Sequence, residues 1–169
     1  MKYIQYSILL FMVYGCKPNN NATEPEKYLD HVGDLTHDPE LDSKDFHSCH
    51  EDLVNQYYAF GQNIQYKGEK RALMNSVYSQ YNGKAFNDTG YITIRFIVNC
   101  EGQSGRFRVK TLDNAYNPVE LNTEMTAQLL SIVKGLDGWI PGMYEGKGYD
   151  YYQYLTFKIE SGEITSILP

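Results

Sequence analysis

Residues 90–100 read GYITIRFIVNC, a stretch in which apolar and polar side chains alternate. Alternation with a period of two is typical of a β-strand that buries one face. The glycine-bearing turn 101–105 follows, and residues 106–111 alternate again, with Phe107 and Val109 on the apolar side. The pattern predicts an antiparallel β-hairpin.

Two more strands are predicted near the carboxyl end of the chain. Residues 149–160 alternate, with apolar side chains on one face and Tyr152 and Tyr154 on the other. A turn at Gly162 then precedes residues 164–168, which favour a short final strand.

Three stretches have the apolar spacing of amphipathic helices. The first lies within residues 43–60, the second follows Gly68, and the third spans residues 122–134, with Asn122 or Thr123 as its cap. The order helix, helix, strand, strand, helix, strand predicts an α+β fold. We expect a small antiparallel sheet of about three strands with two or three helices packed on one face.

The amino terminus has the layout of a secretory signal, because Lys2 precedes an apolar run that is too short to cross a membrane. The segment FMVYGC, residues 11–16, resembles a lipobox. This resemblance implies that residues 1–15 are a signal peptide cleaved before Cys16, and that lipid on the Cys16 thiol holds the mature chain on a membrane. The alternative is an ordinary signal peptide with an incidental cysteine. Lys17, with no Asp beside it, resembles the residue that follows the acylated cysteine in lipoproteins routed to the outer membrane.

Residues 16–43 are rich in Asn, Pro and acidic residues and poor in large apolar side chains. Such a segment buries too little surface to offset the entropy lost on ordering, so a flexible lipidated tether is predicted here. Residues 44–169 then form a single domain.

The whole chain has a formal net charge of −6, which argues against nucleic acid as the main partner. Since Cys16 is consumed by lipid, Cys49 and Cys100 remain. In an oxidising envelope compartment this pair predicts a disulfide, and two buried free thiols are the alternative. No catalytic centre, cofactor or metal site is predicted: His47 and His50 flank Cys49 closely, but no second group of ligands accompanies them.

Residues 90–99, the glycine-bearing turn and residues 106–109 resemble the first hairpin of TonB carboxy-terminal domains. The segment GWIPG, residues 138–142, is similar to the Trp-x-Pro-Gly element of that family, and residues 157–159 are similar to its closing strand. The resemblance covers residues 57–169. It implies a small antiparallel sheet that grips a short peptide by pairing it as an extra strand on an exposed edge.

By the same resemblance, the strand at residues 151–160 is the edge expected to receive the peptide. The chain departs from TonB proteins in two ways: its apolar segment is removed as a signal, and its spacer is short. We therefore expect an envelope lipoprotein that binds peptide segments of an envelope protein by strand addition and does not transduce energy.

The outward sides of the predicted strands gather basic and aromatic side chains on an otherwise acidic protein. Tyrosine rings stack on sugars and are common in protein interfaces, so this face fits an acidic peptide or an anionic cell-wall polymer. A cell-wall or glycan-binding module is thus the second function that the sequence supports, and a merely solvated face is the remaining alternative. The candidate binding residues are Tyr152, Tyr154, Lys158, Arg95, Arg106 and Arg108.

Overall fold

The computed structural model describes residues 33–61 and 63–168. In this part the chain forms a mostly antiparallel five-stranded sheet, a separate two-stranded hairpin and two α-helices. The predicted α+β class is confirmed, but the sheet is larger than the expected three strands. The predicted signal peptide, the predicted lipidation site Cys16 and residues 16–32 of the predicted tether lie outside the described residues.

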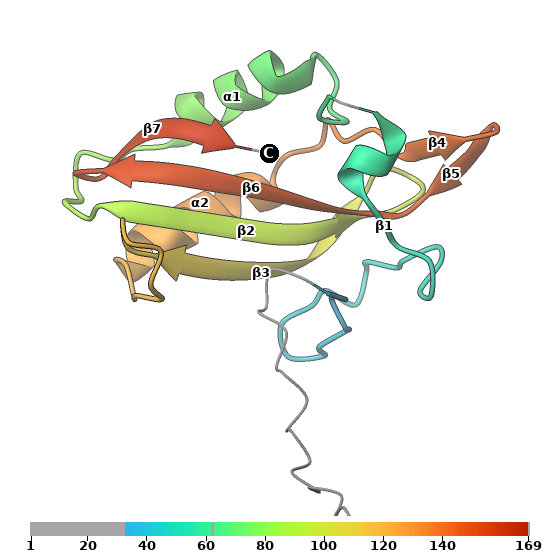
Figure 1. Cartoon of the computed structure of the whole chain (residues 1–169), viewed down its shortest axis with the longest axis horizontal. Coiled ribbons are helices and arrows are strands. Elements are labelled where there is room, and N and C mark those ends of the chain that lie inside the picture. Colours follow the sequence, from blue (N-terminus) through green and yellow to red (C-terminus); the bar gives the residue numbers. More distant parts are fainter. Residues whose placement is uncertain (1–32, 62, 169) are drawn as a thin grey trace, which may run out of the picture.

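The large sheet is built around β6 (Tyr151–Glu160). On one side β6 pairs antiparallel with β2 (Gly90–Val98), which pairs in turn with β3 (Ser104–Leu112). On the other side β6 pairs with β7 (Glu163–Leu168) and, at its first two residues, with the short parallel strand β1 (Asn55–Gln56), as Figure 1 shows. The central strand is therefore β6, and one end of the sheet is β3.

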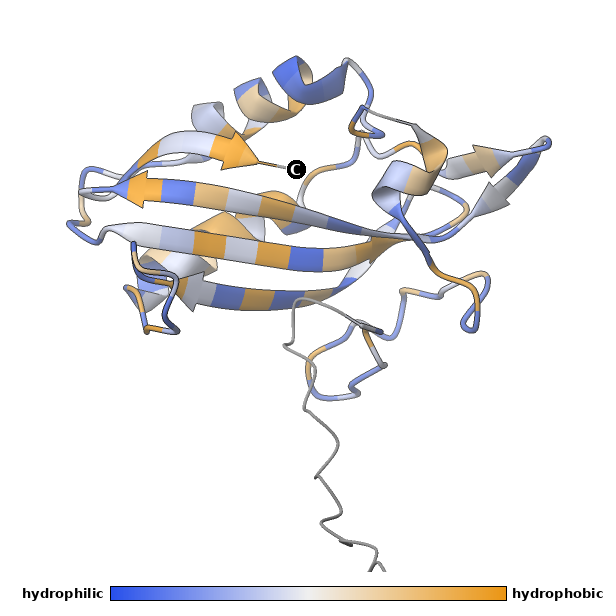
Figure 2. Ribbon diagram, in the orientation of Figure 1, coloured by the Kyte–Doolittle hydropathy of each residue, from blue (hydrophilic) through white to orange (hydrophobic). Residues whose placement is uncertain are grey.

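The predicted hairpin is confirmed as β2 and β3. Its register places Thr93 opposite Lys110 and Arg95 opposite Arg108. The register shifts between Arg95 and Ile97, and on β3 this irregularity coincides with Arg106, whose φ is 55°. The alternation that predicted the strands appears in Figure 2 as coloured stripes along β2 and β6.

Both helices pack on one face of the sheet, as the sequence predicts. Helix α1 (Glu69–Gln80) buries Leu73 and Val77, and α2 (Thr123–Lys134) buries four apolar residues in the same core cluster as Ile92 and Phe157. Full burial of such a side chain contributes roughly 1.5–3 kcal/mol. The cap of α2 is also confirmed, since the Asn122 side chain accepts hydrogen bonds from the backbone N–H groups of Glu124 and Met125.

The helix predicted within residues 43–60 is wrong. This segment consists of turns and bends, followed by β1 and a single 3-10 turn, η1 (Tyr57–Phe60). Its backbone is held by distant residues instead: Cys49 is bonded to Cys100, and the N–H of His50 donates to Asp150. Long-range contacts thus override an apolar spacing that resembles a helix.

A second hairpin was not predicted. Strands β4 (Gly142–Tyr144) and β5 (Lys147–Tyr149) pair across a two-residue turn in which Glu145 and Gly146 both have positive φ. This backbone geometry matches the right-handed twist of the flanking strands.

The expected tether does not extend to residue 43, since the chain is folded against the sheet from residue 33 onward. Leu35 is buried with Ile97 and Tyr152, and Asp42 is buried as well. We call residues 33–54 the strap, and Figure 1 shows it (blue to cyan) beside β3, away from α1. Among the described residues, no helix has both the length and the apolar character needed to span a membrane.

Candidate functional site

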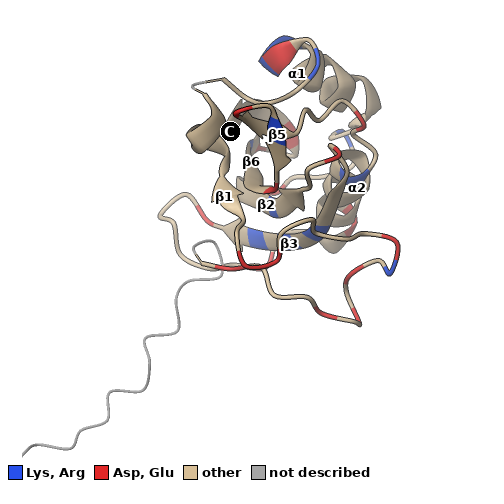
Figure 3. Cartoon of the chain, turned by 90° about the vertical axis from the view of Figure 1, so that its right-hand side faces the viewer, with Lys and Arg blue, Asp and Glu red and all other residues tan. Residues whose placement is uncertain are grey.

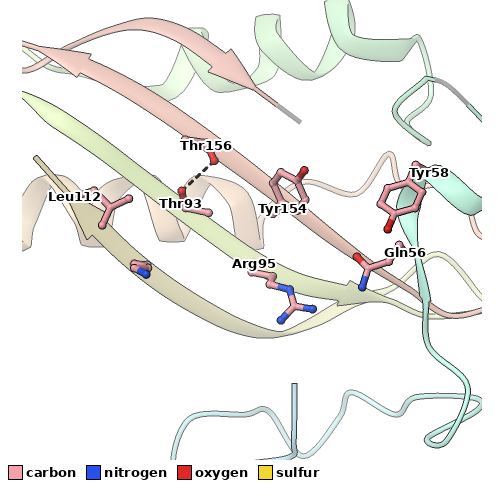
Figure 4. Close-up of a pocket in the computed structure, with 8 residues that line it drawn as sticks. Gln56, Tyr58, Thr93, Arg95, Leu112, Tyr154 and Thr156 are labelled. Atoms are coloured by element: carbon pink, nitrogen blue, oxygen red, sulfur yellow. Dashed lines mark hydrogen bonds between the residues drawn. The ribbon is translucent and has the colours of Figure 1, made fainter. Parts of the chain in front are cut away.

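A groove runs over the face of the large sheet that lies opposite the helices, here called the open face. Its floor is formed by Thr93 and Arg95 of β2 and by Tyr154 and Thr156 of β6. These side chains share a face because residues two apart on a strand point to the same side. The Thr93 and Thr156 hydroxyls lie 2.9 Å apart and form a hydrogen bond across the two strands (Figure 4).

The walls of the groove come from elements on either side of this floor. Strand β3 supplies Lys110 and Leu112, and Gln56 and Tyr58 rise from β1 and η1 at the opposite wall (Figure 4). The enclosed volume is about 440 Å³, within the range of pockets that bind small molecules or parts of a polymer. The groove therefore combines cationic, aromatic, hydroxyl and amide groups in one concave surface.

Arg95 is the buried cation of the groove. The residue is 4% exposed, and its guanidinium carbon lies 4.5 Å from the centre of the Tyr152 ring. Burial lowers the pKa of Arg95 from its ordinary value, although the nearby Asp34 and Tyr152 act in the opposite direction. Among the described residues its guanidinium makes no hydrogen bond and no ion pair, so its donors are available to a ligand.

Tyr154 supplies a hydroxyl and a ring to the same end of the groove. Its ring packs edge-on against Tyr57, with ring centres 5.5 Å apart. Burial raises the pKa of Tyr154 to about 12, so the hydroxyl stays protonated near neutral pH and remains a donor.

Tyr152 and Arg106, two of the predicted binding residues, are covered by the strap. Tyr152 is 5% exposed, and its hydroxyl donates to the Asp34 carboxylate at 3.0 Å. Arg106 donates from Nη1 to the Leu35 carbonyl at 3.1 Å and from Nη2 to the carboxylate of Glu51. The prediction that both side chains face solvent is therefore wrong, because an upstream segment packs on them.

Arg108 is also engaged by the strap. Its Nη1 and Nη2 donate to the two Asp42 carboxylate oxygens at 2.6 and 2.9 Å. Figure 3 shows basic positions along β3 (blue) and acidic positions (red) in the neighbouring loops. The predicted basic face is thus partly neutralised within the protein, and Arg95 is the predicted arginine that lines the groove.

The bond between Asp42 and Arg108 should make the strap acid-sensitive. The Arg108 guanidinium, by its hydrogen bonds, holds the pKa of the Asp42 carboxyl below its ordinary value in the folded state. A lowered folded-state pKa contributes stability above the unfolded value of about 3.9, and this stability is lost as the pH falls through the folded-state value.

We expect Asp42→Asn to lower the free energy of unfolding by roughly 2 kcal/mol at pH 7. The difference from the unsubstituted protein should shrink steadily below about pH 4, because both proteins then lack the charge. Urea titrations at pH 7, 5, 4 and 3 measure it. The exposed residue Asp45 gives the control Asp45→Asn, and a difference for Asp42→Asn that stays constant down to pH 3 would contradict the assignment.

Lys158 lies outside the groove. Its ammonium contacts the Glu160 carboxylate at 2.6 Å, and the strand that carries it is paired on both sides. The expectation that β6 is an exposed edge is wrong, because β7 and β1 occupy its outer side. In the described part of the chain, β3 forms one end of the sheet, and β1 and β7 lie on its other side.

The cysteine pair forms a disulfide at the end of the sheet where β2 stops and β6 starts. The Cys49 and Cys100 Cα atoms lie 6.0 Å apart. The carboxylate of Asp150, fully buried beside the bond, accepts from the Ser48 hydroxyl and from the backbone N–H groups of His50 and Cys100 at 2.6–2.7 Å. Cys49, Cys100 and Asp150 lie close enough together to hold a metal ion, but both sulfurs are bonded to each other.

Several groove residues were absent from the predicted site. Thr93 and Thr156 lie on the predicted outward faces. The alternation that selected Arg95 and Tyr154 could therefore have identified these two threonines as well. Gln56 and Tyr58 could not be found, because their segment resembled a helix.

No protein family matches the chain, and no curated protein or solved structure is significantly similar to it. The resemblance to TonB carboxy-terminal domains therefore remains a prediction from the sequence.

Proposed function

We propose that the chain is a lipid-anchored envelope protein whose domain binds a segment of a partner protein by strand addition and catalyses no reaction. The observation that carries the proposal is the outer edge of β3. In the described part of the chain no strand pairs with this edge, and it borders the groove through Lys110 and Leu112.

Strand addition requires an unpaired strand edge, and β3 has one whereas β6 is paired on both sides. The loop after β3 returns as far as Thr111, whose carbonyl accepts from the Val119 N–H at 3.3 Å, and Leu112 forms an isolated bridge with Pro118. Among the described residues, the backbone from 107 to 109 makes no backbone–backbone hydrogen bond outside the hairpin. Unpaired N–H and C=O groups on such an edge are a template for an extended peptide.

A strand added to β3 would also extend the open face. Neighbouring strands lie about 4.8 Å apart, so alternate side chains of the added segment would stand beside Lys110 and reach over the groove. Backbone pairing would then supply affinity, and the groove would supply preference for particular side chains.

The lining of the groove supports binding rather than catalysis. Its described side chains are two cations, two threonines, two tyrosines, a glutamine and a leucine. A general base or nucleophile in such a site is most often a carboxylate, histidine or thiol, and none of these lines it. Lipid on Cys16 would keep the domain at the membrane, and Lys17 supports the outer membrane as its location.

Photo-crosslinking in cells tests the proposal. A photoreactive phenylalanine at Val109, exposed on β3, or at Tyr154, in the groove, should capture the same discrete envelope protein. The matched control is the exposed Tyr78 of α1, on the helical side of the sheet, which should capture little of it. Equal capture from all three positions, or from Tyr78 alone, would count against an interface at β3.

Proline substitution tests the role of the β3 backbone. Because N–H groups of adjacent residues point to opposite sides of a strand, one of Val109→Pro and Lys110→Pro removes an outward N–H. That variant should stay folded, as circular dichroism would report, and lose capture from Tyr154. Unchanged capture by both variants would exclude strand addition at β3.

Exposed tyrosines favour a second candidate, a module that binds cell-wall glycan. Tyr58 is 65% exposed at one end of the groove, and Tyr116 is 68% exposed and stacked on Tyr91 near the other end. Exposed rings of this kind can stack on sugars. Retention on insoluble cell wall that is lost in a Tyr58→Ala/Tyr116→Ala variant, without protein capture, would favour this candidate over strand addition.

A further inference from the structure

The groove contains a buried cation whose hydrogen-bond donors are unfilled by the described protein groups. Tyr152 covers one face of the Arg95 guanidinium, and Figure 4 shows the group extending from β2 toward the side of Gln56. A guanidinium has five N–H donors in a planar fork that matches a carboxylate in a two-bond pair. No Arg95 nitrogen is among the fully buried polar atoms that lack a partner in the described part of the chain, so these donors open onto the groove.

Asp34 supplies negative charge near Arg95 without pairing with it. Its carboxylate accepts the Tyr152 hydroxyl at 3.0 Å and raises the pKa of Arg95 through its charge, but no ion pair joins Asp34 to Arg95. The strap therefore leaves the guanidinium fork open while keeping an acidic group close by. An incoming anion would meet repulsion from Asp34 and attraction from Arg95.

The other polar groups of the groove favour the same ligand. Lys110 adds a second cation from β3, and the Tyr154 hydroxyl and the Thr93–Thr156 pair offer donors along the floor. Leu112 and the tyrosine rings supply apolar contact for the uncharged part of a ligand. A polypeptide segment presents this combination where an acidic side chain extends from its backbone.

We infer that Arg95 binds the carboxylate of an Asp or Glu side chain on the docked segment and makes the groove selective for acidic sequences. This inference rests on the proposed function, because the segment is the one that β3 receives. It assigns to Arg95 the choice of partner, and to the β3 edge the binding of the partner's backbone.

Titration of the full chain in nonionic micelles with two short peptides tests the inference. The probes are acetyl-Thr-Glu-Thr-amide and its Gln counterpart, which is equal in shape and uncharged. The Glu peptide should shift the NMR signal of the Arg95 Nε–H saturably and bind roughly ten- to a hundredfold more tightly than the Gln peptide, the range for hydrogen bonds to a charged group.

Two variants and one control separate the role of Arg95 from a general effect of charge. Arg95→Gln should remove the preference for Glu over Gln, whereas Arg71→Gln, at an exposed site on α1, should retain it. Asp34→Asn should tighten binding of the Glu peptide, because a competing negative charge is removed. Equal binding of both peptides to the unsubstituted protein, or a preference that survives Arg95→Gln, would overturn the inference.

The failure of this inference differs from the failure of the proposed function. If Val109 captures an envelope protein in cells and the Glu preference is missing, strand addition stands and the carboxylate site does not. If the Glu peptide shifts Arg95 but no protein is captured, the site stands without its proposed partner. A shift caused by glucuronate and not by the Glu peptide would assign the groove to an acidic sugar and overturn the peptide ligand.

Discussion

Replacement of both Cys49 and Cys100 by serine should lower the free energy of unfolding by about 4 kcal/mol. The two residues are 51 positions apart, and closing a loop of this length in the unfolded chain removes entropy worth about that amount at 25 °C. The bond joins the strap to the end of β2, so its loss frees an element with few other regular backbone bonds. A domain of this size commonly has a total stability of 5–15 kcal/mol, of which about 4 kcal/mol is a large share.

Urea denaturation of the oxidised protein, the reduced protein and the double-serine variant measures this effect. The reduced protein should behave like the variant, and the variant should be insensitive to reductant. Hydrogen exchange should report the largest loss of protection in the strap and near residue 100, with α2 protected as before. A loss below about 1 kcal/mol, far smaller than the usual 2–5 kcal/mol for a native disulfide, would contradict the expected stabilisation by this bond.

The sheet and both helices could be predicted because local patterns and tertiary structure agree there. Strands β2 and β6 each turn one face of apolar side chains to the helices, so their alternation survives in the sequence. Helix α2 has its cap at Asn122 and an apolar stripe of four buried residues. The turn at Glu145 and Gly146 also carried a usable signal, a two-residue connection ending in Gly, although its strands are only three residues each.

The strap could not be predicted because no local pattern encodes its contacts. Phe46 and Cys49 have helical spacing, yet Phe46 packs beside Gly105, where a Cβ would collide with its ring, and Cys49 is bonded to Cys100. Leu35 lies in a stretch whose composition resembles a tether, and one buried leucine does not change that composition. Such contacts join residues dozens of positions apart, so they become visible only in three dimensions.

For the same reason, only part of the lining of the groove could be predicted from the sequence. The alternation of side chains along β2 and β6 identifies those that point away from the core, and it correctly selects Arg95 and Tyr154. It does not reveal that the strap bonds to Tyr152 and Arg106, whereas Arg95 lines the groove without a hydrogen bond to the strap. Nor does this alternation reveal that β3 rather than β6 is an edge strand, because that depends on β7 and β1 occupying the outer side of β6.

Asp150→Ala should lower the free energy of unfolding by roughly 3 kcal/mol, the second largest effect expected. The carboxylate is fully buried and accepts from Ser48, His50 and Cys100, so its removal leaves two backbone N–H groups and a hydroxyl without partners. A buried donor left unsatisfied costs about 1–3 kcal/mol. Asp45→Ala, at an exposed site in the same strap, is the control and should change stability by less than about 0.5 kcal/mol.

Asp150 and the disulfide hold the same two segments together, so their contributions should overlap. In a double-mutant cycle, Asp150→Ala should cost at least about 1 kcal/mol less in the double-serine background, because residues in one network couple by roughly 0.5–3 kcal/mol. The reason is that a freed strap lets water reach the donors near Cys100. Strict additivity would mean that the strap stays docked without the disulfide, held by Asp42 and Leu35 on the open face. The protection of the strap from hydrogen exchange would then depend mainly on the bond between Asp42 and Arg108. This protection should therefore become more sensitive to acid.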